Sequence, residues 1–196
     1  MTGSKRGGHI PGPRPEGYGG VPAGKGSVPP GGSSIVLALG SNLGDRQDIL
    51  QGAVDAVAAI PGVYVDVASP VYETAPVGGP EQPDYLNAVL LARTTLAPRE
   101  LLDQLHRVEA AFDRVREVRW GPRTLDIDII TYEGVLSDDP VLTLPHPRAH
   151  ERAFVLAPWH DADPSAEIPG RGAVAGLLAG AGDGGIRRSK EELILR

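Results

Sequence analysis

The order of strand-like and helix-like patterns leaves this chain few possible folds. Apolar runs and strict alternation indicate strands, whereas apolar residues three or four positions apart indicate amphipathic helices. In chain order, the patterns predict a strand at 35–39, a helix at 47–60, strands at 63–68 and 85–95, a helix at 98–112 and a strand at 124–132. The order β-α-β-β-α-β is that of a ferredoxin-like α+β sandwich. We therefore expect an antiparallel sheet with helices packed on one of its faces.

The two ends of the chain show weaker patterns. Residues 1–34 hold 11 of the 26 Gly and 6 of the 19 Pro residues, which predicts a disordered leader or linker. A near match to a phosphate-binding loop at 19–26 lacks the final hydroxyl residue and the flanking strand and helix, so we discount it. We expect residues 35–196 to form the folded domain. Its last third is predicted to hold short helices at 149–158 and 173–179 and a terminal strand at 192–195.

Charge and composition exclude several classes of protein. A net charge of −6 argues against binding of nucleic acid through general attraction to its phosphate backbone. The chain has no cysteine, which excludes disulfides, thiolate zinc sites and thiol catalysis. No apolar run approaches the roughly 18 residues of a membrane span. We expect a cytoplasmic monomer that acts on small molecules.

The last expected strand has an acidic face. Asp126 and Asp128 are two residues apart, and side chains two apart on a strand point to the same side of the sheet. Leu125, Ile127 and Ile129 would then face the core. Two carboxylates about 7 Å apart along a strand can bind a hard cation such as Mg²⁺. The same alternation also suits an ordinary solvated sheet face, and the stretch alone does not choose between the two.

A run of arginines leads into this strand. Arg114, Arg116, Arg119 and Arg123 fall within ten residues. A guanidinium group can bind a phosphate through two parallel hydrogen bonds, and Mg²⁺ commonly joins carboxylates to substrate phosphates. A solvated loop is the simpler interpretation of the arginines by themselves. Together with the aspartate pair, they favour a nucleotide triphosphate site.

Histidine and aromatic residues add to the candidate site. His146 and His150 are four residues apart, but Pro147 argues against a helix here, and therefore against a metal site on a shared helix face. One histidine that donates to a phosphate fits better. Trp120 and Phe154 lie beside the polar motifs and are suited to stacking on a flat heteroaromatic substrate, although anchoring of core or loop is the alternative.

The stretch from Arg119 to Ile129, RWGPRTLDIDI, resembles the signature of the 6-hydroxymethyl-7,8-dihydropterin pyrophosphokinases. Supporting segments are LGSNLG at 39–44, QPDYLN at 82–87 and LPHP at 144–147. The resemblance runs in order from about residue 35 to residue 164. It implies transfer of pyrophosphate from ATP to the pterin hydroxymethyl group, with release of AMP, in folate synthesis.

The resemblance also implies roles for individual residues. Two Mg²⁺ ions on the ATP phosphates would be held by Asp126 and Asp128. The phosphates would be bound by Arg114, Arg116 or Arg119, and Arg123. The remaining nucleotide contacts would come from His106, Glu109, Ile129, Thr143, His146 and Arg152. The pterin would be contacted by Thr74, Ala75, Val77, Tyr85, Asn87, Trp120 and Phe154, with the two aromatic rings on either side of the pterin plane.

Two other functions remain open from the sequence. A ferredoxin-like binding module could use the same pocket to sense a ligand without catalysis. A different metal-dependent nucleotidyl or phosphoryl transferase would need the same carboxylates and arginines. Detection of AMP in the presence of ATP, Mg²⁺ and the pterin separates these functions from the pyrophosphokinase.

Overall fold

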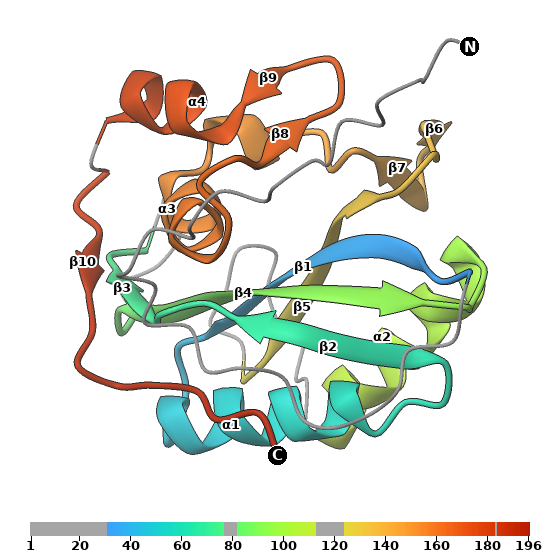
Figure 1. Ribbon diagram of the computed structural model, residues 1–196. Helices are drawn as coiled ribbons and strands as arrows, with labels where there is room; N and C mark the ends of the chain where they lie inside the picture. Colours follow the sequence, from blue (N-terminus) through green and yellow to red (C-terminus); the bar gives the residue numbers. More distant parts are fainter. Residues whose placement is uncertain (1–30, 77–81, 113–123, 183) are drawn as a thin grey trace, which may run out of the picture.

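The computed structural model describes residues 31–76, 82–112, 124–182 and 184–196. Figure 1 shows a sheet with helices above and below it. The strands are β1 (Ser33–Ser41), β2 (Val63–Ala68), β3 (Tyr72–Thr74), β4 (Tyr85–Thr94), β5 (Asp126–Tyr132), β6 (Ser137–Asp139), β7 (Leu142–Leu144), β8 (Glu167–Ile168), β9 (Gly172–Ala173) and β10 (Arg187–Arg188). The helices are α1 (Arg46–Ala58), α2 (Pro98–Ala111), the short 3₁₀ turn η1 (Ala149–Glu151), α3 (Ala153–Ala162) and α4 (Val174–Ala181).

The long strand β4 organises the main sheet. Its neighbour on one side is β1, which pairs in turn with β5. On the other side, β2 pairs with the Leu90–Thr94 half of β4 and β3 with the Tyr85–Asn87 half. The short strand β10 pairs with the outer edge of β3, and every one of these pairings is antiparallel. The predicted α+β class with an antiparallel sheet is therefore confirmed.

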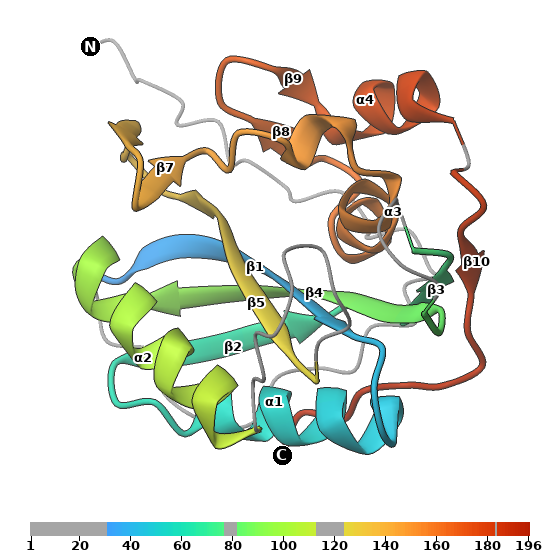
Figure 2. The same cartoon turned by 180° about the vertical axis from the view of Figure 1, so that it is seen from behind.

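Helices cover both faces of the sheet, which corrects the expectation of a single covered face. Figures 1 and 2 place α1 and α2 on one side of the sheet and α3 and α4 on the other. Leu37 of β1 is buried against α1 and α2, whereas its neighbour Val36 belongs to the apolar cluster beneath α3. A strand that is buried on both faces is apolar throughout. This explains why β1 has the sequence of a continuous apolar run instead of an alternating one.

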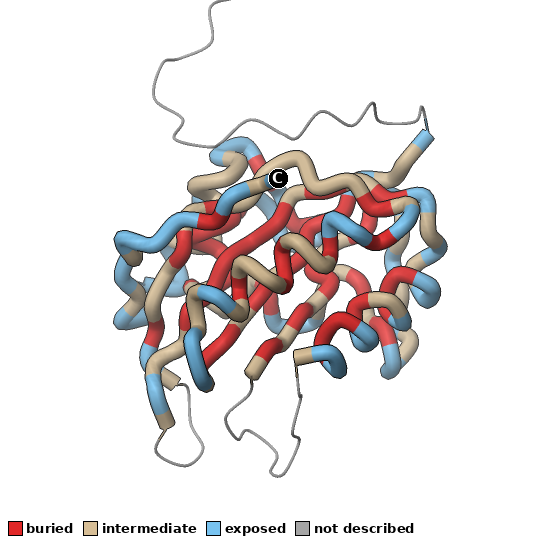
Figure 3. The backbone as a smooth tube through the Cα atoms, turned by 90° about the horizontal axis from the view of Figure 1, so that it is seen from below, coloured by how far each residue is buried: buried red, intermediate tan, exposed pale blue. Residues whose placement is uncertain are grey.

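The α1 and α2 side agrees with the sequence-based expectation. The helix predicted at 47–60 is α1, and its buried residues are Leu50, Ala53, Val54 and Val57. The apolar stripe of α2 is also buried, with Leu101 and Leu105 at full burial. At the start of α2, the Ala97 amide donates to the Glu100 carboxylate at 3.0 Å, which satisfies one of the free amides of the first turn. Figure 3 views the buried strands and helix faces from this side.

The last third of the chain departs from prediction in two places. The helix expected at 149–158 is divided, with a 3₁₀ turn before α3, and α3 continues through Pro158 to Ala162. The expected strand at 192–195 does not form. Instead, the side-chain amide of Gln51 donates to the Ile194 carbonyl at 2.8 Å and its oxygen accepts from the Ile194 amide at 2.8 Å. Side chains of α1 thus take the backbone bonds that a partner strand would have made.

The N-terminal boundary also shifts. β1 begins at Ser33, so residues 33 and 34 belong to the sheet and not to the tail. The Ser34 amide donates to the Glu133 carboxylate at 2.7 Å. The discounted phosphate-loop match at 19–26 lies outside the described residues. Among the helices that the structure describes, none is long and apolar enough to cross a bilayer.

Candidate active site

The acidic face of β5 points toward α3. Leu125, Ile127 and Ile129 are buried on the α1 and α2 side, as the alternation predicts. Asp126 and Asp128 are half-buried and lie on the opposite face. The face of the sheet that carries the two carboxylates is not an ordinary solvated face, because α3 covers the neighbouring strands on that face.

A cation lies beside the second carboxylate. Arg152 immediately precedes α3, and its Nη1 is 3.5 Å from Oδ2 of Asp128. The guanidinium carbon of Arg152 also lies 5.6 Å from the centre of the Phe154 ring, within cation–π distance. The N-terminal end of α3 therefore places a guanidinium and an aromatic ring next to the acidic strand.

His146 approaches the same carboxylate from a loop. Its backbone amide donates to the Ile130 carbonyl at 2.8 Å, which fixes the loop to β5. Its Nε2 lies 3.8 Å from Oδ2 of Asp128, and its Nδ1 accepts from the Arg148 amide at 3.2 Å. Because Nδ1 is an acceptor, the ring proton is on Nε2 and faces the acidic site.

Burial, and secondly the positive charge of Arg152, lower the pKa of His146 to about 4. The imidazole is therefore neutral near pH 7 and can donate a hydrogen bond from Nε2 without bringing a charge. The second histidine is separate from it: Nε2 of His150 lies 3.4 Å from the Glu151 carboxylate. This fits the expectation of one donating histidine better than a histidine metal pair.

Helix α2 contributes a buried carboxylate. Glu109 is 1% exposed and accepts from the Ile127 amide at 2.9 Å. The bond ties α2 to β5 between the two aspartates. His106 lies on α2 three residues earlier and is exposed. Thr143 lies on β7, where its hydroxyl donates to the Asp139 carbonyl at 3.0 Å.

A second polar group lies at the other end of the sheet face. Thr74 of β3 and Asn87 of β4 are both buried, and Asn87 Nδ2 donates to Thr74 Oγ1 at 2.9 Å. Tyr85 lies opposite Thr74 in the pairing, and its hydroxyl donates to Gln82 at 3.3 Å. Ala75 follows Thr74 and is exposed.

Gly40 separates the two polar groups. In the sheet it lies directly opposite Asn87 of β4 on one side and Asp126 of β5 on the other. Opposed residues of antiparallel strands point to the same face, so Asn87 and Asp126 flank a position without a side chain. With strands about 4.8 Å apart, their Cα atoms are about 10 Å apart. A Cβ on Gly40 would lie 3.3 Å from Asn87 Oδ1.

Asn42 is a further residue for which the sequence patterns gave no individual role. It is 1% exposed, and its Nδ2 donates to the Gln82 side chain at 2.9 Å and to the Pro83 carbonyl at 3.1 Å. The bonds join the segment after β1 to the segment before β4. Its position in the LGSNLG segment was the only available signal, because strand and helix patterns do not mark such a side-chain bridge.

Several predicted site residues lie outside the described residues. These are Arg114, Arg116, Arg119, Trp120, Arg123 and Val77. The described residues bring together Asp126, Asp128, His146 and Arg152, with Glu109 behind the strand. They bring Thr74, Asn87 and Tyr85 together at the neighbouring strands.

The donor set fits Mg²⁺ bound with a phosphate ligand. Within residues 31–76, 82–112, 124–182 and 184–196, no three His, Asp or Glu side chains converge on a metal position. Mg²⁺ is usually bound by one or two carboxylates together with water and substrate phosphates. Asp126 and Asp128 supply that number of carboxylates on one strand face. A metal bound here would depend on the substrate for its remaining ligands.

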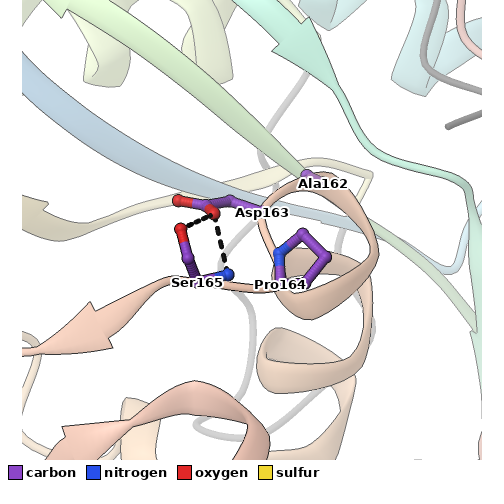
Figure 4. A pocket seen from close by; sticks show the side chains of 4 residues that line it. All are labelled: Ala162, Asp163, Pro164 and Ser165. Carbon is purple, nitrogen blue, oxygen red and sulfur yellow. Dashed lines mark hydrogen bonds between the residues drawn. The ribbon is translucent and has the colours of Figure 1, made fainter. Parts of the chain in front are cut away.

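A shallow hollow elsewhere has a structural explanation. A space of about 460 Å³ is lined by Ala162, Asp163, Pro164 and Ser165 at the end of α3. Figure 4 shows these four side chains. Oδ1 of Asp163 accepts from the amide and the hydroxyl of Ser165 at 2.9 and 2.7 Å. These bonds form the turn that ends the helix. The hollow does not include the acidic strand.

Comparison with known proteins identifies the family. A family model described as 7,8-dihydro-6-hydroxymethylpterin-pyrophosphokinase (HPPK) matches residues 36–164. The chain belongs to the HPPK family. A 2-amino-4-hydroxy-6-hydroxymethyldihydropteridine pyrophosphokinase of Methylorubrum extorquens is 45% identical over 152 residues, covering 78% of this chain and 96% of the relative. One of Pseudomonas aeruginosa is 41% identical, covering 79% and 95%. The predicted pyrophosphokinase class is thereby confirmed.

Solved structures support the HPPK fold. A Plasmodium falciparum HPPK-DHPS with pterin and p-hydroxybenzoate has a TM-score of 0.60 at 14% identity, over 80% of this chain. An HPPK-DHPS in complex with substrates has a TM-score of 0.59 at 12% identity, over 76% of this chain. This chain spans less than half the length of those proteins, 45% and 43%. At this identity the likeness concerns the fold alone.

Proposed function

We propose that the protein transfers pyrophosphate from ATP to 6-hydroxymethyl-7,8-dihydropterin, giving AMP and the pterin diphosphate in folate synthesis. The observation that carries the proposal is the spacing on one sheet face. The Thr74–Asn87 pair and the Asp126–Asp128 pair lie on either side of Gly40. A flat polar heterocycle bound at the Thr74–Asn87 pair would place one of its substituents near phosphates bound at the Asp126–Asp128 pair.

The strand order supports a ferredoxin-like arrangement. The four main positions across the sheet are β2 with β3, then β4, β1 and β5, and all are antiparallel. The two α-helical connections pack α1 and α2 on one face. We assign α3, α4 and the C-terminal segment as additions to that arrangement. They cover the face that carries the polar residues.

We assign the nucleotide end of the site to the acidic strand. Asp126 and Asp128 would hold two Mg²⁺ ions together with the ATP phosphates, and the bound ions would neutralise charge on the phosphoryl oxygens. Arg152 and the Nε2 proton of His146 lie beside Asp128 and can donate to the same phosphate chain. We assign the remaining nucleotide contacts to Glu109, His106, Thr143 and the Ile129 backbone. We assign further phosphate contacts to three arginines outside the described residues, Arg114, Arg116 and Arg123.

We assign the pterin end to β3 and β4. The hydrogen-bonding edge of the ring would be contacted by the Asn87 amide and by the backbone at 74–77, which includes Thr74, Ala75 and Val77. Tyr85 would support this pocket, and Phe154 with Trp120 would stack on the ring faces. The pterin hydroxyl then attacks the β-phosphorus and releases its proton, the bond from that phosphorus to the α-phosphate oxygen breaks, and AMP leaves with that oxygen. Positioning and charge neutralisation supply most of the catalysis in such transfers.

The chemistry is tested by incubating the protein with ATP, Mg²⁺ and the pterin and measuring AMP. AMP formed only when all three are present supports the proposal. ATP consumption without the pterin, or with a different acceptor, would point to another phosphoryl transferase. Pterin binding without AMP would point to a binding module.

Two further assignments go with this proposal. The sequence-based boundary put the tail at 1–34 and the folded domain at 35–196; because β1 begins at Ser33, we assign only the residues before Ser33 to a segment that catalysis does not require. We also propose that the protein works as a cytoplasmic monomer on small molecules, with no nucleic-acid or membrane partner. The net charge of −6 supports the exclusion of nucleic acid.

A further inference from the structure

The C-terminal segment lies beyond the HPPK match, which ends at residue 164, yet it returns to the sheet. β10 pairs with β3 so that Arg187 lies opposite Glu73 and Arg188 opposite Tyr72. The Ser189 amide continues the pairing by donating to the Val71 carbonyl at 2.8 Å. Figures 1 and 2 both show β10 beside β3 at the edge of the molecule. We call residues 187–196 the C-terminal strap.

Glu73 is the centre of an ionic network under this strap. Its Oε2 accepts from Arg187 Nε at 2.9 Å and from Arg187 Nη2 at 2.7 Å. Its Oε1 accepts from Arg46 Nη1 at 3.0 Å, and the same Nη1 donates to the Asp84 carbonyl at 2.8 Å. Arg187 Nη2 also lies 3.8 Å from the Asp84 carboxylate. The hydrogen bonds from Arg187 are the main reason that the pKa of Glu73 is lowered.

The network spans the elements that frame the pterin end of the proposed site. Arg46 begins α1, Glu73 lies on β3, and Asp84 immediately precedes β4. Tyr72 and Arg188 form the adjacent pair of the two strands. The Tyr72 hydroxyl donates to Asp161 of α3 at 2.8 Å, and Arg188 lies 3.6 Å from the same carboxylate. The strap thus binds β3 both to α1 and to α3.

β3 needs such support because it is short. It has three residues, and only those three pair with β4. Without β10, β3 would be the edge strand of the sheet, and a short edge strand opens more readily than a central one because few buried contacts hold it. Thr74 is its last residue and accepts the Asn87 hydrogen bond. Opening of β3 would separate Thr74 from Asn87 and leave the Asn87 amide without its partner.

We propose that Arg187 is a positioning residue for the pterin: by clamping Glu73 it holds β3 against β4 and keeps the Thr74–Asn87 pair in its binding geometry. This inference rests on the proposed function. A binding-competent state that is only partly populated weakens apparent affinity in proportion to its population. Opening of β3 should weaken binding of the pterin and leave binding of ATP unchanged, because β4 and β1 separate β3 from the acidic strand β5.

The test compares Arg187→Ala with Arg196→Ala. Both arginines are on the strap, both side chains are 69% exposed, and each pairs with one carboxylate side chain at close range. Arg196 lies 3.1 Å from Asp55 of α1, and among the described residues no hydrogen bond or ion pair joins it to β3. We expect Arg187→Ala to raise the KM for the pterin about threefold, as expected if about a third of the molecules keep β3 paired. kcat and the KM for ATP should stay within about twofold, and Arg196→Ala should change none of them.

Two additional measurements separate positioning from general stability. Amide exchange at 72–74 should be faster in Arg187→Ala and unchanged in Arg196→Ala. Arg187→Lys, which cannot bind the carboxylate through two nitrogens, should be intermediate. An equal KM for the pterin in both alanine variants, with AMP still formed by the wild type, would overturn this inference alone. A wild-type protein that forms no AMP would overturn the proposed function instead.

Discussion

Nη1 of Arg152 lies 3.5 Å from Oδ2 of Asp128, so the start of α3 supplies a cation to the acidic strand β5. If both groups act on the ATP phosphates, Arg152→Ala should lower kcat/KM for ATP by about 10- to 100-fold, because a charged contact to the transferring group is lost. Arg148→Ala is the matched control, since Arg148 is 54% exposed and pairs with Glu151. Steady-state AMP formation checks the prediction. Equal loss in both variants would contradict a specific role for Arg152.

Gly40 sets the space between the two ends of the proposed site. In Gly40→Ala the new Cβ would lie 3.3 Å from Asn87 Oδ1 and 3.8 Å from the Tyr85 ring. We expect the KM for the pterin to rise about tenfold, the scale of a displaced substrate-binding group, with a smaller effect on ATP.

The control for Gly40 is Gly176→Ala in α4, where a Cβ would meet no atom within 4 Å. This variant should keep wild-type kinetics and gain about 0.5 to 1 kcal/mol in the free energy of unfolding, because alanine favours a helix more than glycine does. Unchanged pterin kinetics in Gly40→Ala would show that the space above Gly40 is not used.

Tyr72 should make stability fall at alkaline pH. Burial, and secondly the hydrogen bond to Asp161, raise the pKa of Tyr72 to about 12. An unfolded tyrosine titrates near pH 10, so the unfolded chain releases its proton first. The contribution of Tyr72 to the free energy of unfolding is therefore complete below about pH 10 and is lost as the pH rises toward 12.

Tyr72→Phe should remove this effect. We expect it to lower the free energy of unfolding by about 1 kcal/mol near neutral pH, through loss of the hydrogen bond, and to make the alkaline decline shallower. Urea unfolding at several pH values measures both changes, with Tyr64→Phe as the control. If the free energy of unfolding declined as steeply at alkaline pH in Tyr72→Phe as in the wild type, the assignment of this effect to Tyr72 would be contradicted.

Residues 1–30 should be dispensable. Deleting them leaves β1 and the bond from the Ser34 amide to Glu133 intact. We expect kcat and both KM values to stay within about twofold of wild type, as for a segment with no role in the site. A deletion that also removes Ser33 and Ser34 takes away part of β1 and should lower stability. Loss of activity from the shorter deletion would show that the tail takes part in function.

The sequence anticipated the features that depend on local pattern. The alternation around Asp126 and Asp128 placed both carboxylates on one face, and the helical spacing of Leu101 and Leu105 placed α2 on the core. The element order gave the antiparallel sheet. Such features are encoded within a few neighbouring residues, so periodicity is sufficient to find them.

Features that depend on distant contacts could not be found from local patterns. α3 is apolar nearly all round, and a helix of that kind has no stripe to show which sheet face it covers. β10 has only two residues, too few for any strand pattern. Arg152, His146 and Asp128 lie on three separate segments, so no periodicity places them together. The family resemblance implied that all three serve the nucleotide, and the structure adds the distances between them.

The most direct test of the proposed function compares AMP formation by the wild type with that of Asp126→Asn and Asp128→Asn. Each substitution keeps the size of the side chain and removes the charge that Mg²⁺ requires, so kcat should fall about 100-fold or more. Circular dichroism and urea unfolding should remain close to wild type, because both side chains lie on the half-buried face. AMP formed at the wild-type rate by both folded variants would contradict the account.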